Sequence, residues 1–422
     1  MGAAPVGEIW RRIAHTSSAR IYSLLLGMVS LALTARWLGP DGRGTVAAVT
    51  TWVSLFTTFG YLSLGQVAIY RAAQSPGEEW LPATFGSLAF MLVAITGLGW
   101  ALAAILYFIS DGAIFHGLAG LFLLIGFLGL PLMLWEHYGG SLLMALERLD
   151  ISNRYQVIGK TVGVAALFVF ILGWGWGIAG ALLAILLGNL VQALGGLRYL
   201  LGRVGRPSLD WRELLELVKG GVKLHLNAIG TFLFAGSDVL MLNHYAGAAP
   251  TGFYQLAFQL VAVLLVVPHA ASMVIYGKIS LLGPDRGWGY QRKVVAGVML
   301  LMAVGVGVSY LLAPWAIPLF AGQDFQPSVT LFQWLLLGAL GMSLTQMISP
   351  QWIGRGLFIQ AALLTLFVGG ANVVANYFLI PAYGALGAVW ASLGVYVVSI
   401  LGNGLMAIYC EMKFRATNDD VQ

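Results

Sequence analysis

Charged residues are scarce in this chain, and their scarcity excludes the soluble globular class. Asp, Glu, Lys and Arg together make up 9% of the 422 residues, whereas soluble domains carry about 25%. Apolar runs recur from end to end, and each matches the ~20 residues that an α-helix needs to cross a hydrocarbon core. The alternation of polar and apolar residues that a membrane β-barrel requires is missing. The composition therefore predicts an all-α, polytopic membrane protein.

Cysteine and catalytic motifs are also lacking. Cys410 is the only cysteine, which excludes a disulfide framework or a thiol metal site within one chain. The HExxH, Walker A, Rossmann and Cys/His patterns are absent. We therefore expect no catalytic residues, no metal and no cofactor. The net charge of +5 is explained by membrane topology rather than by nucleic acid, so no nucleic-acid partner is expected.

Twelve membrane-spanning helices are predicted from the apolar runs between clusters of helix-breaking residues. If the N-terminus is cytoplasmic, the outer loops hold only Arg36 and Arg43, and the other twenty basic residues lie toward the inner side. This bias follows the positive-inside rule with both termini in the cytoplasm. The expected spans are 13–38, 44–71, 81–110, 117–146, 151–173, 177–201, 214–245, 251–282, 290–320, 326–354, 357–380 and 384–410.

An internal repeat divides the chain near its middle. The turn 39–44 (GPDGRG) and the turn 247–252 (GAAPTG) share a six-residue frame at an offset of 208. The segment 177–195 resembles 384–402 at an offset of 207. We therefore predict two six-helix lobes, 1–201 and 214–422. Because six is even, the lobes are parallel and related by a pseudo-two-fold axis along the membrane normal, an arrangement typical of transporters that rock one half against the other.

The segment between the predicted lobes, 202–213, is expected to be a cytoplasmic amphipathic connector. Asp210 and Glu213 have the spacing of a capping box. An apolar face follows, formed by Trp211, Leu214, Leu215 and Val218. We expect this segment to lie along the inner membrane interface before the seventh helix begins.

Polar stripes on the first, seventh and eighth helices predict a shared central cavity, because a helix that faces only lipid has no use for polar residues. Basic residues near the inner ends of their helices either snorkel toward the headgroups or attract an anion such as a phosphate. The candidate substrate-binding residues are Arg20, Ser23, Lys160, Lys223, Asn227, Gln255 and Gln259.

Three titratable residues are candidates for ion coupling: Asp238, Glu136 and His137. Asp238 lies about two turns below the outer end of the seventh helix, where it either packs against other helices or binds a cation or proton. Glu136 and His137 are adjacent and therefore about 100° apart on a helix, so they cannot easily serve one ligand. Structural packing and a proton relay are both open for this pair.

Four segments resemble the polysaccharide-exporter (Wzx-type) flippases of the multidrug/oligosaccharidyl-lipid/polysaccharide exporter superfamily. They are RWLGPDGRGTVAAV (36–49), GSDVLMLNHYAGAAPTGFYQLAFQL (236–260), PLFAGQDFQPSVTLFQWL (318–335) and ANVVANYFLIPAYGALGAVWASLG (371–394). The resemblance implies a twelve-helix transporter of the bacterial cytoplasmic membrane. It would move isoprenoid-pyrophosphate-linked oligosaccharides from the inner to the outer leaflet for surface polysaccharides such as O-antigen and exopolysaccharide.

The resemblance also implies partners and roles. Arg20 and Lys223 would meet the pyrophosphate, membrane lipids would surround the protein, and polysaccharide polymerase machinery is a candidate further partner. Arg36 and Arg43 would be structural at an outer gate or would touch the emerging anionic glycolipid. Two alternatives stay open. A cation-coupled multidrug antiporter of the same superfamily would need deep acidic residues. A membrane glycosyl-polymerase or ligase would need a sizeable outer loop, and the predicted outer loops are short.

Overall fold

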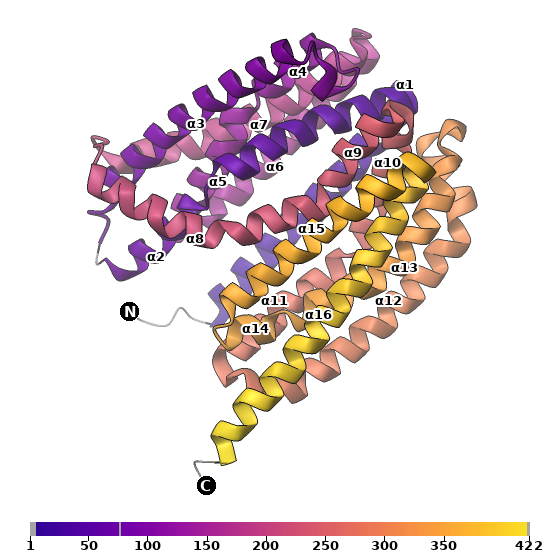
Figure 1. Cartoon of the computed structure of the whole chain (residues 1–422). Coiled ribbons are helices and arrows are strands. Elements are labelled where there is room, and N and C mark those ends of the chain that lie inside the picture. The colour runs from indigo at the N-terminus through magenta and orange to yellow at the C-terminus, as the bar shows by residue number, and fades with distance from the viewer. Residues whose placement is uncertain (1–5, 76, 420–422) are drawn as a thin grey trace. The chain divides into compact units, whose positions relative to one another are not determined.

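The computed structural model describes residues 6–75 and 77–419, with side chains described for 21–75 and 77–410. Over these residues the chain forms helices joined by short turns and contains no strand, so the all-α class is confirmed. A π-helical turn, η2 (Phe168–Gly173), and two 3-10 turns, η1 (Ala113–Phe115) and η3 (Gln323–Phe325), complete the elements. The α-helices, labelled in part in Figure 1, are α1 (Val6–Gly60), α2 (Leu64–Gln74), α3 (Leu81–Ile109), α4 (Gly120–Phe127), α5 (Leu130–Ala145), α6 (Leu149–Leu167), α7 (Gly177–Val204), α8 (Trp211–Ala235), α9 (Ser237–Ala246), α10 (Ala248–Leu264), α11 (Val266–Leu282), α12 (Pro284–Ala321), α13 (Pro327–Ile348), α14 (Pro350–Gly354), α15 (Phe358–Tyr383) and α16 (Ala385–Asp419).

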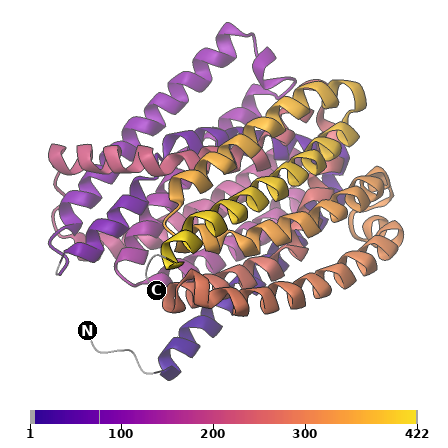
Figure 2. The ribbon, with the colours of Figure 1, turned by 60° about the horizontal axis from the view of Figure 1, so that its bottom comes forward.

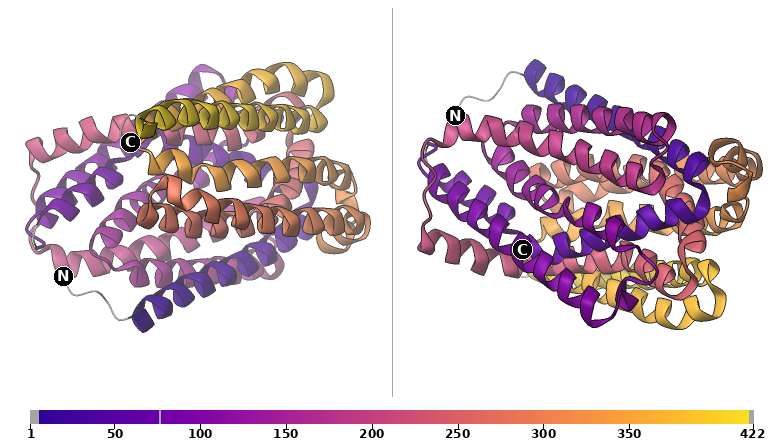
Figure 3. Two further views of the ribbon diagram at one scale, coloured as in Figure 1. Left: turned by 90° about the horizontal axis from the view of Figure 1, so that it is seen from below. Right: turned by 90° about the horizontal axis from the view of Figure 1, so that it is seen from above.

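The first helix, α1, reverses direction at Gly39. Gly39 has φ 65° and ψ −175°, a conformation that only glycine adopts readily, and Pro40 follows it. Figure 3 shows the indigo ribbon of α1 as two arms that are joined at one end. Arg43 Nη1 lies 3.5 Å from Thr34 Oγ1, whereas nine residues of straight helix would span about 13.5 Å. The predicted hairpin between the first two membrane helices is therefore present.

The described residues contain enough apolar helix for twelve membrane spans. Ten helical segments are long and apolar enough to cross a membrane, and the bent pair α10 and α11 makes an eleventh. One of the ten, Ile21–Gly60, has 40 residues and would extend about 60 Å if straight, twice the thickness of a hydrocarbon core. Dividing it at Gly39 gives the twelve spans that the sequence predicts.

The chain divides into two compact units, Met1–Ala228 (unit 1) and Ile229–Gln422 (unit 2). In unit 1, α6 and α7 pack against each other along their length, and α1 and α5 pack against both. In unit 2, α15 packs against α16 and α12 against α13 (Figure 2). The division falls inside α8, whose early residue Leu217 is buried in the core of unit 1.

Local backbone conformation repeats between the two units. Gly39 in unit 1 and Gly247 in unit 2 are 208 positions apart, and both have positive φ with ψ near 180°. Gly177 and Gly384 are 207 positions apart and have φ of 53° and 56°. Matching strained turns at matching positions support the internal repeat, because each such turn needs a glycine that the two halves of the sequence share.

Several predicted helices are broken in the structure. The second span breaks at Leu62 and Ser63, which adopt the left-handed conformation, and the fourth breaks between α4 and α5. The eighth bends by 43° between α10 and α11, just before Pro268, which cannot donate a backbone hydrogen bond. Apolar runs continue through these breaks, which is why hydropathy alone joins the pieces.

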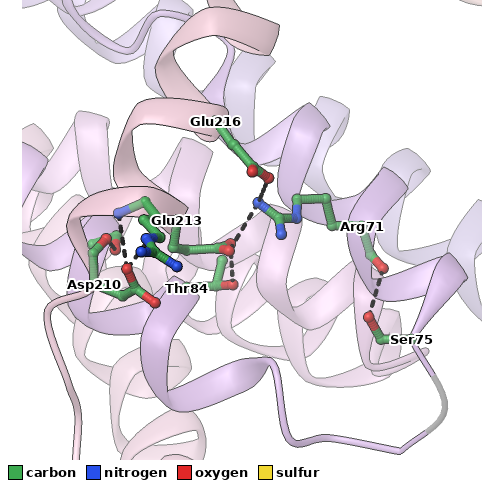
Figure 4. Close-up of polar contacts among 8 residues, drawn as sticks. Arg71, Ser75, Thr84, Asp210, Glu213 and Glu216 are labelled. Atoms are coloured by element: carbon green, nitrogen blue, oxygen red, sulfur yellow. Dashed lines mark hydrogen bonds and ion pairs between the residues drawn. The ribbon is translucent and has the colours of Figure 1, made fainter.

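The start of α8 is docked onto unit 1 by polar contacts (Figure 4). Asp210 Oδ1 accepts hydrogen bonds from the backbone N–H groups of Arg212 (2.8 Å) and Glu213 (3.4 Å), and so caps the helix. The Glu213 side chain does not complete a capping box. It accepts a hydrogen bond from Thr84 Oγ1 at 2.8 Å and pairs with Arg71 Nη1 at 2.8 Å.

The apolar face that the sequence predicts for this segment is divided. Leu214 is buried, whereas Trp211 and Leu215 are exposed. Trp211 packs edge-on against Phe90 of α3. Both sides of α8 are therefore apolar near its start, and the inward side, with Leu217, belongs to the core of unit 1. The predicted lobe and connector boundaries stay a prediction.

Candidate functional site

Unit 1 contains a polar cavity of about 290 Å³ between α1, α5, α6 and α7. The helices α6 and α7 approach closely beside it because both carry glycine there: a Cβ added to Gly159 would lie 2.6 Å from the carbonyl oxygen of Gly188. The polar side chains that line the cavity are Ser30, Glu136, Gln156, Lys160, Asn189 and Gln192.

Glu136 and Lys160 face this cavity together. Their opposite charges attract each other, but no direct ion pair between them occurs within the described residues. Glu136 Oε1 is buried without a hydrogen-bond partner among the described residues. Both charged groups are therefore available to a ligand, and such groups in a membrane protein indicate a site.

His137 does not line the cavity that Glu136 lines, because adjacent residues point about 100° apart on a helix. Its ring stacks on Tyr61 at a centroid distance of 4.2 Å, and Tyr61 meets the ring of His225 edge-on at 5.1 Å. A nitrogen of His225 lies 3.1 Å from Ser63 Oγ. Because Tyr61 and Ser63 lie in the break between α1 and α2, these contacts hold that break against α8. His225 was not among the residues predicted from the sequence.

The predicted outer-gate arginines differ in environment. Arg43 is 7% exposed and lies against Thr34 across the hairpin of α1, which is a structural position. Arg36 is exposed. Among the other candidates on α1, Ser23 is buried with its hydroxyl lacking a described hydrogen-bond partner. The side chain of Arg20 lies outside the described residues.

The candidates on α8 and α10 are not gathered into the unit 1 cavity. Lys223 and Asn227 are exposed on α8, and none of the ion pairs among the described residues involves Lys223. Gln255 and Gln259 are half-buried on α10. Gln255 Oε1 has no hydrogen-bond partner among the described residues. The structure thus brings Lys160 and Glu136 together in one cavity, whose lining does not include Lys223, Asn227, Gln255 or Gln259.

Asp238 in unit 2 lies at the centre of a buried polar cluster. It is 1% exposed and accepts hydrogen bonds from Tyr254 Oη (2.5 Å) and Ser392 Oγ (3.1 Å) at one carboxylate oxygen. The other oxygen accepts from the amides of Asn372 and Asn376, each at 2.5 Å. Four donors therefore offset the burial of one carboxylate, which is costly without such partners.

The amide oxygens of this cluster remain unused. Asn372 Oδ1 and Asn376 Oδ1 are both buried without hydrogen-bond partners among the described residues. No basic side chain contributes to the cluster. Carboxylate, amide and hydroxyl oxygens are ligands that hard cations prefer, and a lone buried carboxylate equally favours a proton. Among the described residues no three His, Cys, Asp or Glu side chains converge as metal ligands.

Asp238 is recognisable from the sequence as a candidate, whereas its four hydrogen-bond partners were not predicted. Asn372 and Asn376 are one helical turn apart and therefore lie on one face of α15, a signal that was present in the sequence. Tyr254 immediately precedes Gln255, and only Gln255 was predicted as a site residue. Ser392 is 154 positions from Asp238, and no local pattern links the two.

The family described as "Polysaccharide biosynthesis protein" matches residues 9–280, well over half of the chain. The chain belongs to this family. The family resemblance seen in the sequence is thereby confirmed. No curated protein sequence was found to match the chain.

Solved structures with a similar fold are membrane transporters. The lipid II flippase MurJ in an inward closed conformation has a TM-score of 0.77 and 14% identity, over 93% of this chain and 87% of MurJ. An inward-facing multidrug resistance MATE family transporter of the MOP superfamily has a TM-score of 0.71 and 15% identity, over 93% and 96% of the two chains. At these identities the similarity establishes the fold of the family member described here, and not its substrate.

Proposed function

We propose that the protein moves isoprenoid-pyrophosphate-linked oligosaccharide units from the inner to the outer leaflet of the bacterial cytoplasmic membrane, by alternating access, for surface polysaccharide synthesis. The observation that carries this proposal is the combination of a polysaccharide-biosynthesis family with a transporter fold. The fold provides membrane-spanning helices and a polar cavity. The family links the protein to polysaccharide biosynthesis.

Basic side chains would hold the pyrophosphate. Lys160 lines the unit 1 cavity without a direct ion pair, and Lys223 is exposed on α8. Together with Arg20 they offer the charge-assisted donors that phosphate oxygens accept. Ser23, Asn227, Gln255 and Gln259 would add neutral contacts to the sugars. Membrane lipids surround the spans, and polysaccharide polymerase machinery would receive the unit outside.

Asp238 would couple transport to an ion. A proton or small cation bound at its carboxylate would neutralise a buried charge and would engage the unused oxygens of Asn372 and Asn376. Loss of that ion leaves the carboxylate charged and dependent on its four donors. Two states of one buried group are what an ion-driven cycle requires. Glu136 would serve as a second titratable group beside Lys160, and His137 as a neighbour that fixes the break of the second span.

A cation-coupled multidrug antiporter is the second candidate. The similarity to MATE transporters and the buried Asp238 favour it. An antiporter of organic cations uses acidic residues to bind its substrate, whereas a pyrophosphate-linked substrate needs basic residues. The two functions therefore differ in which charges are essential.

Charge removal tests the choice between them. In cells that lack the chromosomal gene, we expect Arg20→Gln with Lys223→Gln to abolish surface polysaccharide while the protein remains at normal level in the membrane. Lys293→Gln, an exposed lysine on α12, is the matched control and should restore polysaccharide fully. Full restoration by the double variant would show that both side chains only snorkel. Unchanged polysaccharide together with lost drug tolerance would favour the antiporter.

A further inference from the structure

Unit 2 contains a second cavity, of about 400 Å³, that none of the roles above uses. It lies between α8, α13, α14, α15 and α16. Its volume falls in the range of about 300–1,000 Å³ that small-molecule sites occupy. No charged side chain lines it, whereas seven of its fifteen lining residues are polar and neutral: Thr231, Thr345, Gln346, Ser349, Thr365, Ser399 and Asn403.

The two cavities occupy equivalent positions in the repeat. Five residues of the unit 2 cavity stand 207 or 208 positions after residues that line the unit 1 cavity. The chemistry changes at these positions: Lys160 and Gln156 are replaced by aliphatic side chains, and Leu26 and Asn189 by aromatic rings. The pairs are Leu26 and Phe234, Gln156 and Leu364, Lys160 and Val368, Asn189 and Tyr396, and Gln192 and Ser399.

Two aromatic rings in the wall of the unit 2 cavity are held in place. Trp352 is buried, and its indole N–H donates a hydrogen bond to Asn403 Oδ1 at 2.8 Å. Tyr396 is also buried and packs against Phe234 at a centroid distance of 5.5 Å. Fixed rings lose little conformational freedom when a ligand stacks on them. The C–H face of a sugar ring is a ligand of this shape.

Three of the five serine and threonine hydroxyls in the wall donate their proton to a backbone carbonyl oxygen. Thr365 donates its proton to the carbonyl oxygen of Ala361 at 3.0 Å, Thr345 to that of Met342 at 3.1 Å, and Ser349 to that of Gln346 at 3.0 Å. Each hydroxyl oxygen keeps lone pairs that can accept a bond. A ligand that carries many O–H or N–H donors therefore matches this wall, and an anionic group finds no cation there.

From this geometry we infer that the unit 2 cavity is a subsite for an uncharged sugar residue of the transported oligosaccharide. The inference rests on the function proposed above and refines it. The unit 1 cavity is lined by the charged Lys160 and Glu136, whereas the aromatic, hydroxyl-lined cavity of unit 2 has no charged lining residue and suits a neutral ring. The repeat thus supplies two related cavities whose chemistry has diverged.

A thiol-protection experiment on the purified full-length protein tests the subsite. Ser399→Cys in a Cys410→Ser background places the only thiol in the cavity wall, and Thr365→Cys is a second position should the first variant misfold. The control thiol is Thr330→Cys, at an exposed position on α13 outside the cavity. The probe is the water-soluble oligosaccharide released by mild acid from the host's own lipid-linked unit.

We expect the oligosaccharide to slow maleimide labelling at position 399 at least fivefold and to leave position 330 unchanged. Inorganic pyrophosphate should protect neither position. In cells, filling the cavity with Thr365→Phe should lower surface polysaccharide at least tenfold, and Thr330→Phe should not. Absence of protection at both cavity positions, while the wild-type gene still restores polysaccharide to the deletion strain, overturns the subsite and leaves the proposed function standing. Protection by tetraphenylphosphonium in place of the sugar overturns both.

Discussion

Individual side chains decide whether the buried charge of unit 2 is functional or structural. Asp238 is surrounded by four donors, so removing the whole group and removing only its charge have different consequences. An asparagine at this position can still accept from Asn372 and Asn376, and its amide can donate to the hydroxyl oxygens of Tyr254 and Ser392 after these rotate. The two kinds of variant therefore separate packing from ion binding.

We predict that Asp238→Ala lowers the stability of the protein more than Asp238→Asn does. The alanine variant leaves buried donors without acceptors, at about 1–3 kcal/mol for each donor, and the asparagine variant should stay within about 1 kcal/mol of the wild type. Thermal unfolding in detergent, monitored by size-exclusion chromatography of the protein that remains folded, measures the difference. Asp324→Asn, at an exposed position in η3, is the control.

The same pair of variants tests coupling. Asp238→Asn should fold normally, but its ion-gradient-driven transport rate in proteoliposomes should be at least tenfold lower than that of the wild type. The reason is that the asparagine amide is uncharged and cannot bind and release a proton or cation. Transport that keeps its dependence on the gradient in this variant would show that Asp238 is a packing residue only.

At the scale of elements, helix contacts depend on glycines at chosen positions. In unit 2 a Cβ added to Gly369 of α15 would lie 2.4 Å from the carbonyl oxygen of Gly230 of α8. A Cβ added to the neighbouring Gly370 would meet no atom within 4 Å. Small residues at such contacts allow membrane helices to approach closely.

We therefore predict that Gly369→Ala destabilises the protein by roughly 1–3 kcal/mol, because the two helices must move apart. Gly370→Ala should be neutral. Thermal unfolding of the two variants under identical conditions makes the comparison. Equal midpoints would show that the contact between α8 and α15 adjusts without cost.

The docking of α8 on unit 1 gives a second prediction at this scale. The side chain of Glu213 is 11% exposed and that of Glu216 is 62% exposed, although both pair with Arg71. Since an exposed ion pair contributes little, we expect Glu213→Gln to destabilise by roughly 1–2 kcal/mol and Glu216→Gln by less than about 0.5 kcal/mol. Hydrogen exchange should rise in the first turns of α8 for the first variant only.

The elements also mark the limit of what the sequence predicts. Long apolar runs locate the spans, and glycine-rich turns locate the reversals at Gly39 and Gly247, because both signals are local. The break at Leu62 and Ser63 was not predicted, since it depends on packing against residues such as His225 that are distant in sequence. Arg43 was expected in an outer hairpin, and its burial against Thr34 follows from the reversal of α1 at Gly39, which brings these two residues together across the turn.

Among site residues, the sequence identified charged groups better than their partners. Glu136 and Lys160 were both chosen, and the structure places them in one cavity. The cluster around Asp238 joins residues up to 154 positions apart, and the unit 2 cavity is built from five helices. Single-sequence patterns carry no information about such long-range contacts.

At the scale of the whole molecule, the distribution of basic residues predicts the orientation in the membrane. Alkaline phosphatase fused after Asp41 or Ala249 should be active, because these positions lie in the predicted outer hairpins. A green fluorescent protein fused to the C-terminus should fluoresce, because that end is predicted to be cytoplasmic. The reverse pattern would contradict the assigned sidedness and the direction of transport that depends on it.

The central claim is that the protein carries lipid-linked oligosaccharide to the outer leaflet, and leaflet sidedness tests it most directly. Spheroplasts of cells depleted of the protein are treated with periodate, which does not cross the membrane, and the oxidised fraction of lipid-linked oligosaccharide is measured. The account predicts that this fraction falls at least tenfold on depletion, while the total lipid-linked pool rises, and that both recover when the gene is restored. An unchanged oxidised fraction in depleted cells would contradict it.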